Sequence, residues 1–117
     1  MKDELIALLE TFKFPVFLQG SLSKDAPYPD SFFTFWNGSS DDWDHFDNDA
    51  IGFVWDFDVN FYSSDPTLVN SIPLQVKALL KQNGWIVGGR GFDLATDYPT
   101  HTGRGIIAYK IEKNGGN

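Results

Sequence analysis

The chain has 117 residues, of which 42% are hydrophobic and 16% aromatic, so it is long enough for one domain and too apolar for a disordered protein. Nine basic and sixteen acidic residues give a formal net charge of −7, the wrong sign for binding nucleic acid through phosphate contacts. The absence of cysteine excludes disulfide scaffolds, zinc–thiolate sites and thiol nucleophiles. No apolar run approaches the ~20 residues that span a bilayer, and the early acids Asp3 and Glu4 do not fit a signal peptide. We therefore expect one soluble domain over residues 1–117, with a frayed tail at 114–117 and no membrane partner.

The charges are distributed unevenly along the chain. Residues 25–76 contain ten acids and no Lys or Arg, whereas residues 77–117 contain six bases and three acids. Acidic loops that keep an aromatic-rich chain soluble would explain this pattern. An acidic face and a basic face suited to head-to-tail self-contact would explain it equally well. Composition leaves both interpretations open.

The N-terminal third predicts a helix and two strands. Apolar residues from Leu5 to Phe12 follow helical spacing, and Pro15 ends the helix. Residues 16–19 form a short strand candidate, and residues 20–30 have the composition of a loop. Residues 31–36 are apolar on both faces, which is typical of a strand in a covered sheet or at an interface. A loop is expected from residue 37 onward.

The clearest pattern is the alternation in residues 51–62, which predicts a strand with one buried aromatic face and one polar face. A helix should follow, with Asp65 as N-cap and Pro66 at its first position, and end at Gly84. Pro73 should kink this helix or divide it into two pieces. Strands are expected at 85–87, 92–94 and 105–113, with a hairpin turn at 88–91 and a shared face for Ile107, Tyr109 and Ile111. The predicted fold is α+β: an antiparallel sheet with two helices packed on one face.

Catalytic and metal-binding patterns are missing from the sequence. The acids of residues 41–49 do not have the spacing of a calcium-binding loop, so a solvated hairpin loop is expected there. His45 and His101 belong to no metal or triad motif, and no Gly-x-Ser-x-Gly elbow supplies a nucleophile. Asp56 and Asp58 share one strand face, which describes any amphipathic strand as well as an acid–base pair. We therefore expect no catalytic residue, no metal, no cofactor and no enzyme activity.

Considered as a whole, the sequence resembles the tail-terminator and tail-completion (head–tail joining) proteins of bacteriophages and prophages. The resemblance covers nearly the whole chain and includes the N-terminal helix before Val16, the strand 55–63, the helix that starts at Asp65 and closes in 79–85, and the segment 101–106. It implies a non-enzymatic virion protein, assembled in the host cytoplasm, that forms a hexameric ring on the tail. The implied partners are other copies of the chain, the tail tube and the head connector, without sequence-specific binding of nucleic acid.

The resemblance and the charge pattern together suggest which residues meet a neighbouring subunit or the tube. Heterologous ring contacts join two different patches of one subunit, and patches of opposite charge are complementary. The expected interface residues are Phe32, Trp36, Asp47, Asp49, Asp56, Asp58, Asn60, Arg90 and Arg104.

An acidic protein that mimics DNA, or another small phage inhibitor, is the alternative from a different functional class. The acidic segment 25–76 is compatible with it. A mimic should carry its carboxylates in regular rows, and five of the ten acids instead crowd into residues 41–49. An enzyme with an unrecognised site has no positive support in the sequence.

Overall fold

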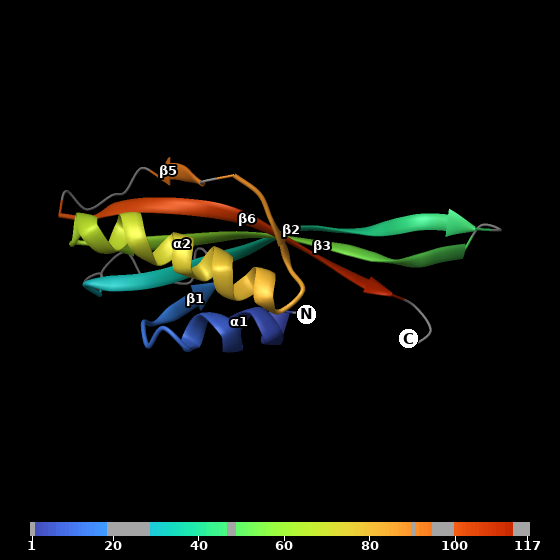
Figure 1. Ribbon diagram of the computed structural model, residues 1–117, viewed down its shortest axis with the longest axis horizontal. Coiled ribbons are helices and arrows are strands. Elements are labelled where there is room, and N and C mark those ends of the chain that lie inside the picture. Colours follow the sequence, from blue (N-terminus) through green and yellow to red (C-terminus); the bar gives the residue numbers. More distant parts are fainter. Residues whose placement is uncertain (1, 19–28, 47–48, 90, 95–99, 114–117) are drawn as a thin grey trace.

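The elements of the chain follow the predicted order, helix, three strands, helix, three strands. The computed structural model describes residues 2–18, 29–46, 49–89, 91–94 and 100–113, with the side chains of 38–46, 49–53, 112 and 113 left aside. The elements are α1 (Lys2–Glu10), β1 (Val16–Leu18), β2 (Ser31–Phe46), β3 (Asp49–Ser63), α2 (Pro66–Gln82), β4 (Ile86–Val87), β5 (Phe92–Leu94) and β6 (Thr102–Lys113). Figure 1 shows both helices lying against one side of the sheet, so the α+β class with helices on one face is confirmed.

The six strands form one mixed sheet rather than a purely antiparallel one. Its order is β1-β2-β3-β6-β4, with β5 also paired to β6. The pairs β2–β3 and β3–β6 are antiparallel, whereas β1 and β2 run parallel, with Val16 opposite Phe33. Residues 19–30 between them provide about the dozen residues that a parallel crossover needs.

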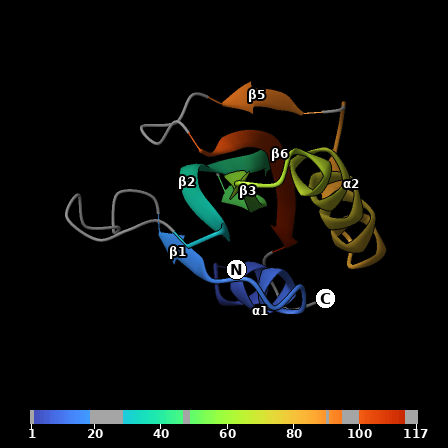
Figure 2. The same ribbon diagram turned by 90° about the vertical axis from the view of Figure 1, so that its left-hand side faces the viewer.

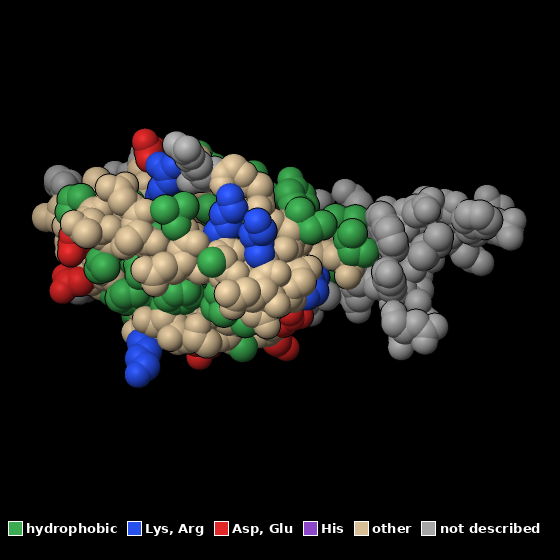
Figure 3. Space-filling view, viewed as in Figure 1, with side chains coloured by type: hydrophobic (Ala, Val, Ile, Leu, Met, Phe, Trp, Pro, Cys, Tyr) green, Lys and Arg blue, Asp and Glu red, His purple; other side chains and the backbone are tan. Residues whose placement is uncertain are grey.

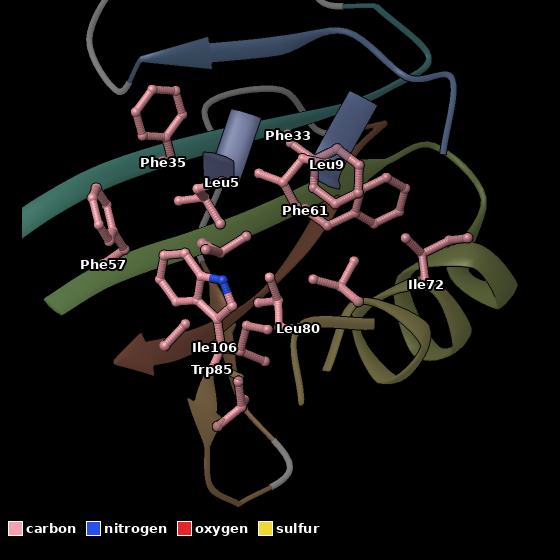
Figure 4. Close-up of a cluster of buried hydrophobic side chains, with 14 residues drawn as sticks. Leu5, Leu9, Phe33, Phe35, Phe57, Phe61, Ile72, Leu80, Trp85 and Ile106 are labelled. Carbon is pink, nitrogen blue, oxygen red and sulfur yellow. The ribbon is translucent and has the colours of Figure 1, made fainter. Parts of the chain in front are cut away.

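The core fills the space between the two helices and the sheet face that they cover. Leu5 and Leu9 of α1 and the stripe 69–80 of α2 meet aromatic residues of the central strands. Figure 4 shows these side chains converging from α1, α2 and the sheet. The buried cluster consists of Leu5, Leu9, Phe33, Phe35, Phe57, Val59, Phe61, Ile72, Val76, Leu80, Trp85, Val87, Ile106 and Ala108. The predicted core face of β3 is thus confirmed for the residues from Trp55 to Phe61, with Trp55 at its partly buried edge.

The ends of α2 are those predicted, and one of the two alternatives predicted for its interior is excluded. Asp65 Oδ1 accepts a hydrogen bond from Thr67 N at 2.9 Å, and Gly84 adopts a φ of +85° just after the C-cap. Pro73, however, lies inside one continuous helix, so the predicted division into two pieces is wrong. Pro73 is itself buried, and burial of the apolar stripe on either side compensates for the one backbone hydrogen bond that proline cannot donate.

A four-group contact fastens the two helices to strand β6. Lys110 Nζ of β6 lies 3.2 Å from Glu4 Oε1 of α1 and donates to Asn83 O, at the end of α2, at 2.6 Å. The same Glu4 carboxylate accepts from Trp85 Nε1 at 3.2 Å, and Lys110 sits 5.5 Å from the Trp85 ring centre. Residues far apart in the sequence therefore hold both helices in place against the sheet.

Strands β2 and β3 continue well past the helices as a long hairpin, where a loop was predicted from residue 37 onward. β2 runs to Phe46 with a register shift between Asn37 and Ser39, and Trp43 pairs with Gly52. Figure 1 shows this extension projecting beyond the body of the molecule. The radius of gyration of 15.6 Å exceeds the ~13 Å of a compact chain of this length, and the long axis reaches 53 Å. Pairing with the strongly β-forming strand β3 overrides the loop-like composition of residues 38–44.

The glycine-rich segment 88–91 is not the expected hairpin turn. β4 and β5 do not pair with each other, because both pair with the same edge of β6, Val87 opposite Ala108 and Phe92 opposite Gly105. Gly89 and Gly91 have φ of +70° and +84°, values that L side chains rarely adopt. The segment therefore connects two short strands, β4 and β5, that pair one after the other with the same edge of β6.

Two leucines on α2 provide a matched test of this packing. Leu80 is fully buried and Leu74 is 53% exposed on the same helix. We expect Leu80→Ala to lower the free energy of unfolding by about 2–5 kcal/mol, because it leaves a cavity, and Leu74→Ala to change it by less than about 1 kcal/mol. Urea denaturation of dilute protein, followed by circular dichroism, measures both. Equal losses would show that α2 does not pack through this face.

Candidate functional site

The sheet face opposite the helices, here called the outer face, carries most of the residues expected at an interface. Because side chains alternate along a strand, burial of Phe33 and Phe35 under the helices places Phe32 and Trp36 on the outer face. The β2–β3–β6 register then sets the outer-face side chains in rows across the sheet. One end of this face is covered and the other is bare.

At the covered end, an aromatic cluster buries Phe32, which was expected at a subunit interface. Phe32 is 1% exposed, with Tyr62 stacked on it at 5.2 Å and the rings of Phe17 and His101 at 6.0 and 6.2 Å. His101 Nε2–H donates to Pro29 O at 2.8 Å, which ties the start of β6 to the segment before β2. Phe32 thus belongs to the interior, and His101 has a structural role.

The next row toward the bare end also lies inside the molecule. Asn60 is 5% exposed and its Nδ2 donates to Thr34 Oγ1 at 3.4 Å, so it too is unavailable as the surface residue that was predicted. A Cβ at Gly105 would lie 2.6 Å from Asn60 Oδ1 and 2.8 Å from the Phe92 ring. The glycine makes room for the aromatic ring of the neighbouring strand, a pairing that covers otherwise bare glycine backbone.

The bare end of the outer face combines exposed apolar side chains with two carboxylates. Register places Trp36, Asp58 and Ile107 in one row, and Asp56, Tyr109 and Ile86 in the next. The four apolar side chains are strongly exposed, from 37% for Ile107 and Tyr109 to 49% for Trp36 and 55% for Ile86. We call these six residues the bare patch. Large apolar side chains that gather around a few polar ones mark a surface that contacts another molecule.

Three members of the bare patch, Ile86, Ile107 and Tyr109, were not among the interface residues expected from the sequence. Ile107 and Tyr109 were expected to share one face of their strand with Ile111, and the register with β3 confirms this, whereas the core residues of β6 are Ile106 and Ala108. Only a small side chain fits at 108, because the cross-strand neighbours Phe57 and Val87 fill the core on either side of it. The glycines at 103 and 105, which share the outer face with Ile107 and Tyr109, were the available signal for this assignment.

The remaining predicted interface residues do not join the bare patch. Arg104 is paired in register with Phe61, hence on the helix side of the sheet, and forms an ion pair with Asp93 at 2.9 Å. Asp47 and Arg90 lie outside the described residues, and of Asp49 only the backbone position at the start of β3 is described. The structure therefore brings together Trp36, Asp56 and Asp58 from the predicted set.

A hollow of about 410 Å³ adjoins the bare patch where the hairpin leaves the body. It lies between the start of α1, the end of β1 and the base of the hairpin, and its described lining is Lys2, Asp3, Leu18, Trp36, Asn37 and Trp55. Two indole rings and a leucine make its walls largely apolar. An apolar hollow of this kind can receive an apolar group of another molecule.

No chemistry-bearing cluster emerges from the part of the chain that the structure describes. Within those residues, no group of three or more His, Asp or Glu side chains is placed to hold a metal ion. None of the helices described is long and apolar enough to cross a membrane. The acidic side chains of residues 41–49 fall outside the described ones, so their lack of tight metal binding stays a prediction.

Comparison with known proteins adds no assignment. The sequence matches no model of a protein family, and no curated protein is significantly similar to it. The function therefore has to be inferred from the geometry of the outer face, together with the resemblance described above.

Two glycines test whether the covered end is packed as described. Gly105→Ala places a methyl group against Asn60 and the Phe92 ring, whereas no atom lies within 4 Å of a Cβ at Gly88. We expect Gly105→Ala to lower the free energy of unfolding by about 1–3 kcal/mol, and Gly88→Ala to leave it unchanged or raise it slightly. Thermal melts of the two variants measure this difference. If both melt like the wild type, Phe92 does not cover Gly105.

Proposed function

We propose that the protein is a structural subunit of a phage virion, a tail-terminator or tail-completion protein that forms a ring, a hexamer by the resemblance, at the head–tail junction. In this role it is not an enzyme. It assembles with copies of itself in the host cytoplasm and contacts the tail tube on one side and the head connector on the other. The observation that carries the proposal is the bare patch.

The bare patch supports self-assembly because it exposes large apolar side chains that the described part of the chain leaves uncovered. Trp36 and Ile86 are about half exposed although Phe32, on the same face, is fully covered. One end of the outer face is buried, whereas aromatic and aliphatic groups are exposed at the other end. Such an exposed apolar surface is typical of a binding site for another protein. Trp36 and Tyr109 are the residue types that most often anchor such contacts.

The projecting β2–β3 hairpin supports the same conclusion. In the described part of the chain β1 pairs with β2 only from Phe33 to Phe35, so the outer edge of β2 from Trp36 onward has no neighbouring strand. Strand β6 pairs with the other side of β3 as far as Gly52, so the unpaired edge of the extension is that of β2. Open strand edges pair readily with other chains. In a ring, a neighbouring subunit or the tail tube would support this hairpin.

The division of charge also fits a ring of identical subunits. The acidic segment 25–76 includes the hairpin and the two carboxylates of the bare patch, and the basic residues of 77–117 follow from α2 onward. Contacts between two different patches of one subunit generate closed rings, and opposite charges orient such contacts. An acidic lumen would also repel DNA that passes through the ring.

Sedimentation velocity tests the assembly directly. We expect oligomers at high protein concentration and low salt that dissociate as ionic strength rises above ~0.15 M, where screening reaches ~8 Å. Trp36→Asp should abolish them, because it replaces a large exposed aromatic side chain of the bare patch with a charge. Ala7→Asp is the matched control, since it adds the same charge to an exposed position on α1 and should assemble like the wild type.

Binding to assembled phage tails is the second measurement. The wild type should cosediment with tails that lack their terminator, and Trp36→Asp should not. A strict monomer at every concentration and salt, with no binding to tails, contradicts the ring. Inhibition of a host DNA-binding enzyme by that monomer would favour the acidic DNA mimic instead.

A further inference from the structure

We propose that the bare patch receives the outer surface of helix α2 from a second copy of the chain, so that each sheet lies between its own helices and a helix of its neighbour. This inference rests on the proposed function and names the contact through which the ring would form. It follows from the side chains, spacing and charge of the two surfaces.

The outer surface of α2 is formed by Leu74, Lys77, Ala78 and Lys81. Their spacing of i, i+3, i+4 and i+7 puts them on one side of the helix, away from the buried stripe 69–80. Leu74 is 53% exposed and Ala78 and Lys81 are exposed as well. Figure 3, which views the helix-bearing side, shows Lys or Arg side chains side by side near the middle of this side, with further Lys or Arg side chains and the Asp and Glu side chains toward its margins.

The spacing of the charges on the two surfaces matches. Asp56 and Asp58 are two residues apart on β3, so their side chains leave the strand about 6.6 Å apart. Lys77 and Lys81 are four residues apart on α2, which separates them by about 6 Å along the helix axis. Lys77 Nζ donates to Gly89 O at 2.6 Å, and an ammonium group has further hydrogens to donate to a carboxylate. A helix laid along β3 therefore brings the two lysines over this strand, and Asp58 is the carboxylate that the contact uses, because Asp56 Oδ1 is buried within the subunit. No ion pair in the described part of the chain involves Asp58.

The apolar groups match as well. With Lys81 over Asp58, Leu74 and Ala78 face the exposed side chains that flank this strand, Ile107 and Tyr109 on one side and Trp36 on the other. Burial of these groups against each other supplies the hydrophobic contribution, and the charges fix the orientation.

The two surfaces cannot meet within one chain. α2 packs on the helix side of the sheet and the bare patch lies on the opposite side, as the view along the long axis shows for the helices and the sheet (Figure 2). Every subunit thus presents one copy of each surface in different directions. Such heterologous contacts repeat from subunit to subunit, and close into a ring when the rotation allows it.

Charge reversal tests the contact in a way that separates it from assembly in general. Asp58→Lys alone and Lys81→Glu alone each place like charges opposite each other, and we expect each to weaken self-association by about tenfold or more in sedimentation equilibrium at low salt. An equimolar mixture of the two variants should associate again. At one kind of contact the introduced lysine of the first variant meets the introduced glutamate of the second, and at the other kind the unaltered Asp58 and Lys81 meet. The double variant should associate by itself.

Lys13→Glu is the matched control, because it makes the same charge change at an exposed position outside both surfaces and should associate like the wild type. Asp58→Asn, which removes the charge without reversing it, replaces Asp58→Lys if the latter fails to fold by circular dichroism, and should weaken association less than Lys81→Glu does. Wild-type association that both reversals leave unchanged overturns this contact and leaves the ring intact. Loss in both variants without recovery in the mixture or the double variant also overturns it. A wild type that neither associates in solution nor binds tails that lack their terminator overturns the ring and this contact together.

Discussion

Burial of the aromatic row of β3 against two helices is the contact on which the rest of this structure depends. Phe57, Val59 and Phe61 pack against both helices and against their neighbours on the adjacent strands. Since side chains alternate along a strand, the same residues that build this core force Asp56 and Asp58 to the opposite face. Both helices of the described residues pack on one side of the sheet, so neither of them covers the polar face of β3.

The elements that the sequence predicts well are those whose pattern is local. The alternation in β3, the helical stripe of α2 and the cap at Asp65 each depend on residues close together in the chain, and each is found in the structure. The hairpin extension of β2 and the parallel pairing of β1 depend on a partner strand far away in sequence. The polar stretch 38–44 becomes a strand because it pairs with β3, and local propensities contain no information about such a distant partner.

The interface residues divide along the same physical line. Trp36, Asp56 and Asp58 are found on the exposed part of the outer face, as strand alternation predicts. Phe32 and Asn60 share that face but are buried. Phe17 and His101, at the start of β6, pack over this end of the sheet, and such long-range packing cannot be predicted from strand alternation. Ile107 and Tyr109 share one face of β6, as strand alternation predicts, but the local pattern does not say which face of this strand is buried. In the structure, the small Ala108 lies on the buried face between its larger neighbours Phe57 and Val87.

The size of the bare patch explains why both surfaces of each subunit have to be used. Two residue rows across three strands cover on the order of 200 Å², well below the ~800 Å² per partner of a stable interface. Burying about 400 Å² in total contributes roughly 10 kcal/mol before costs, which is comparable to the ~4–15 kcal/mol that association loses in freedom of motion. One contact alone is therefore weak. In a closed ring, a subunit can leave only by breaking two contacts at once, and a template such as a tail tube holds the subunits at high local concentration. The same small patch is thus compatible with a monomer in dilute solution and with a stable ring on an assembled tail, and it makes assembly depend on the template.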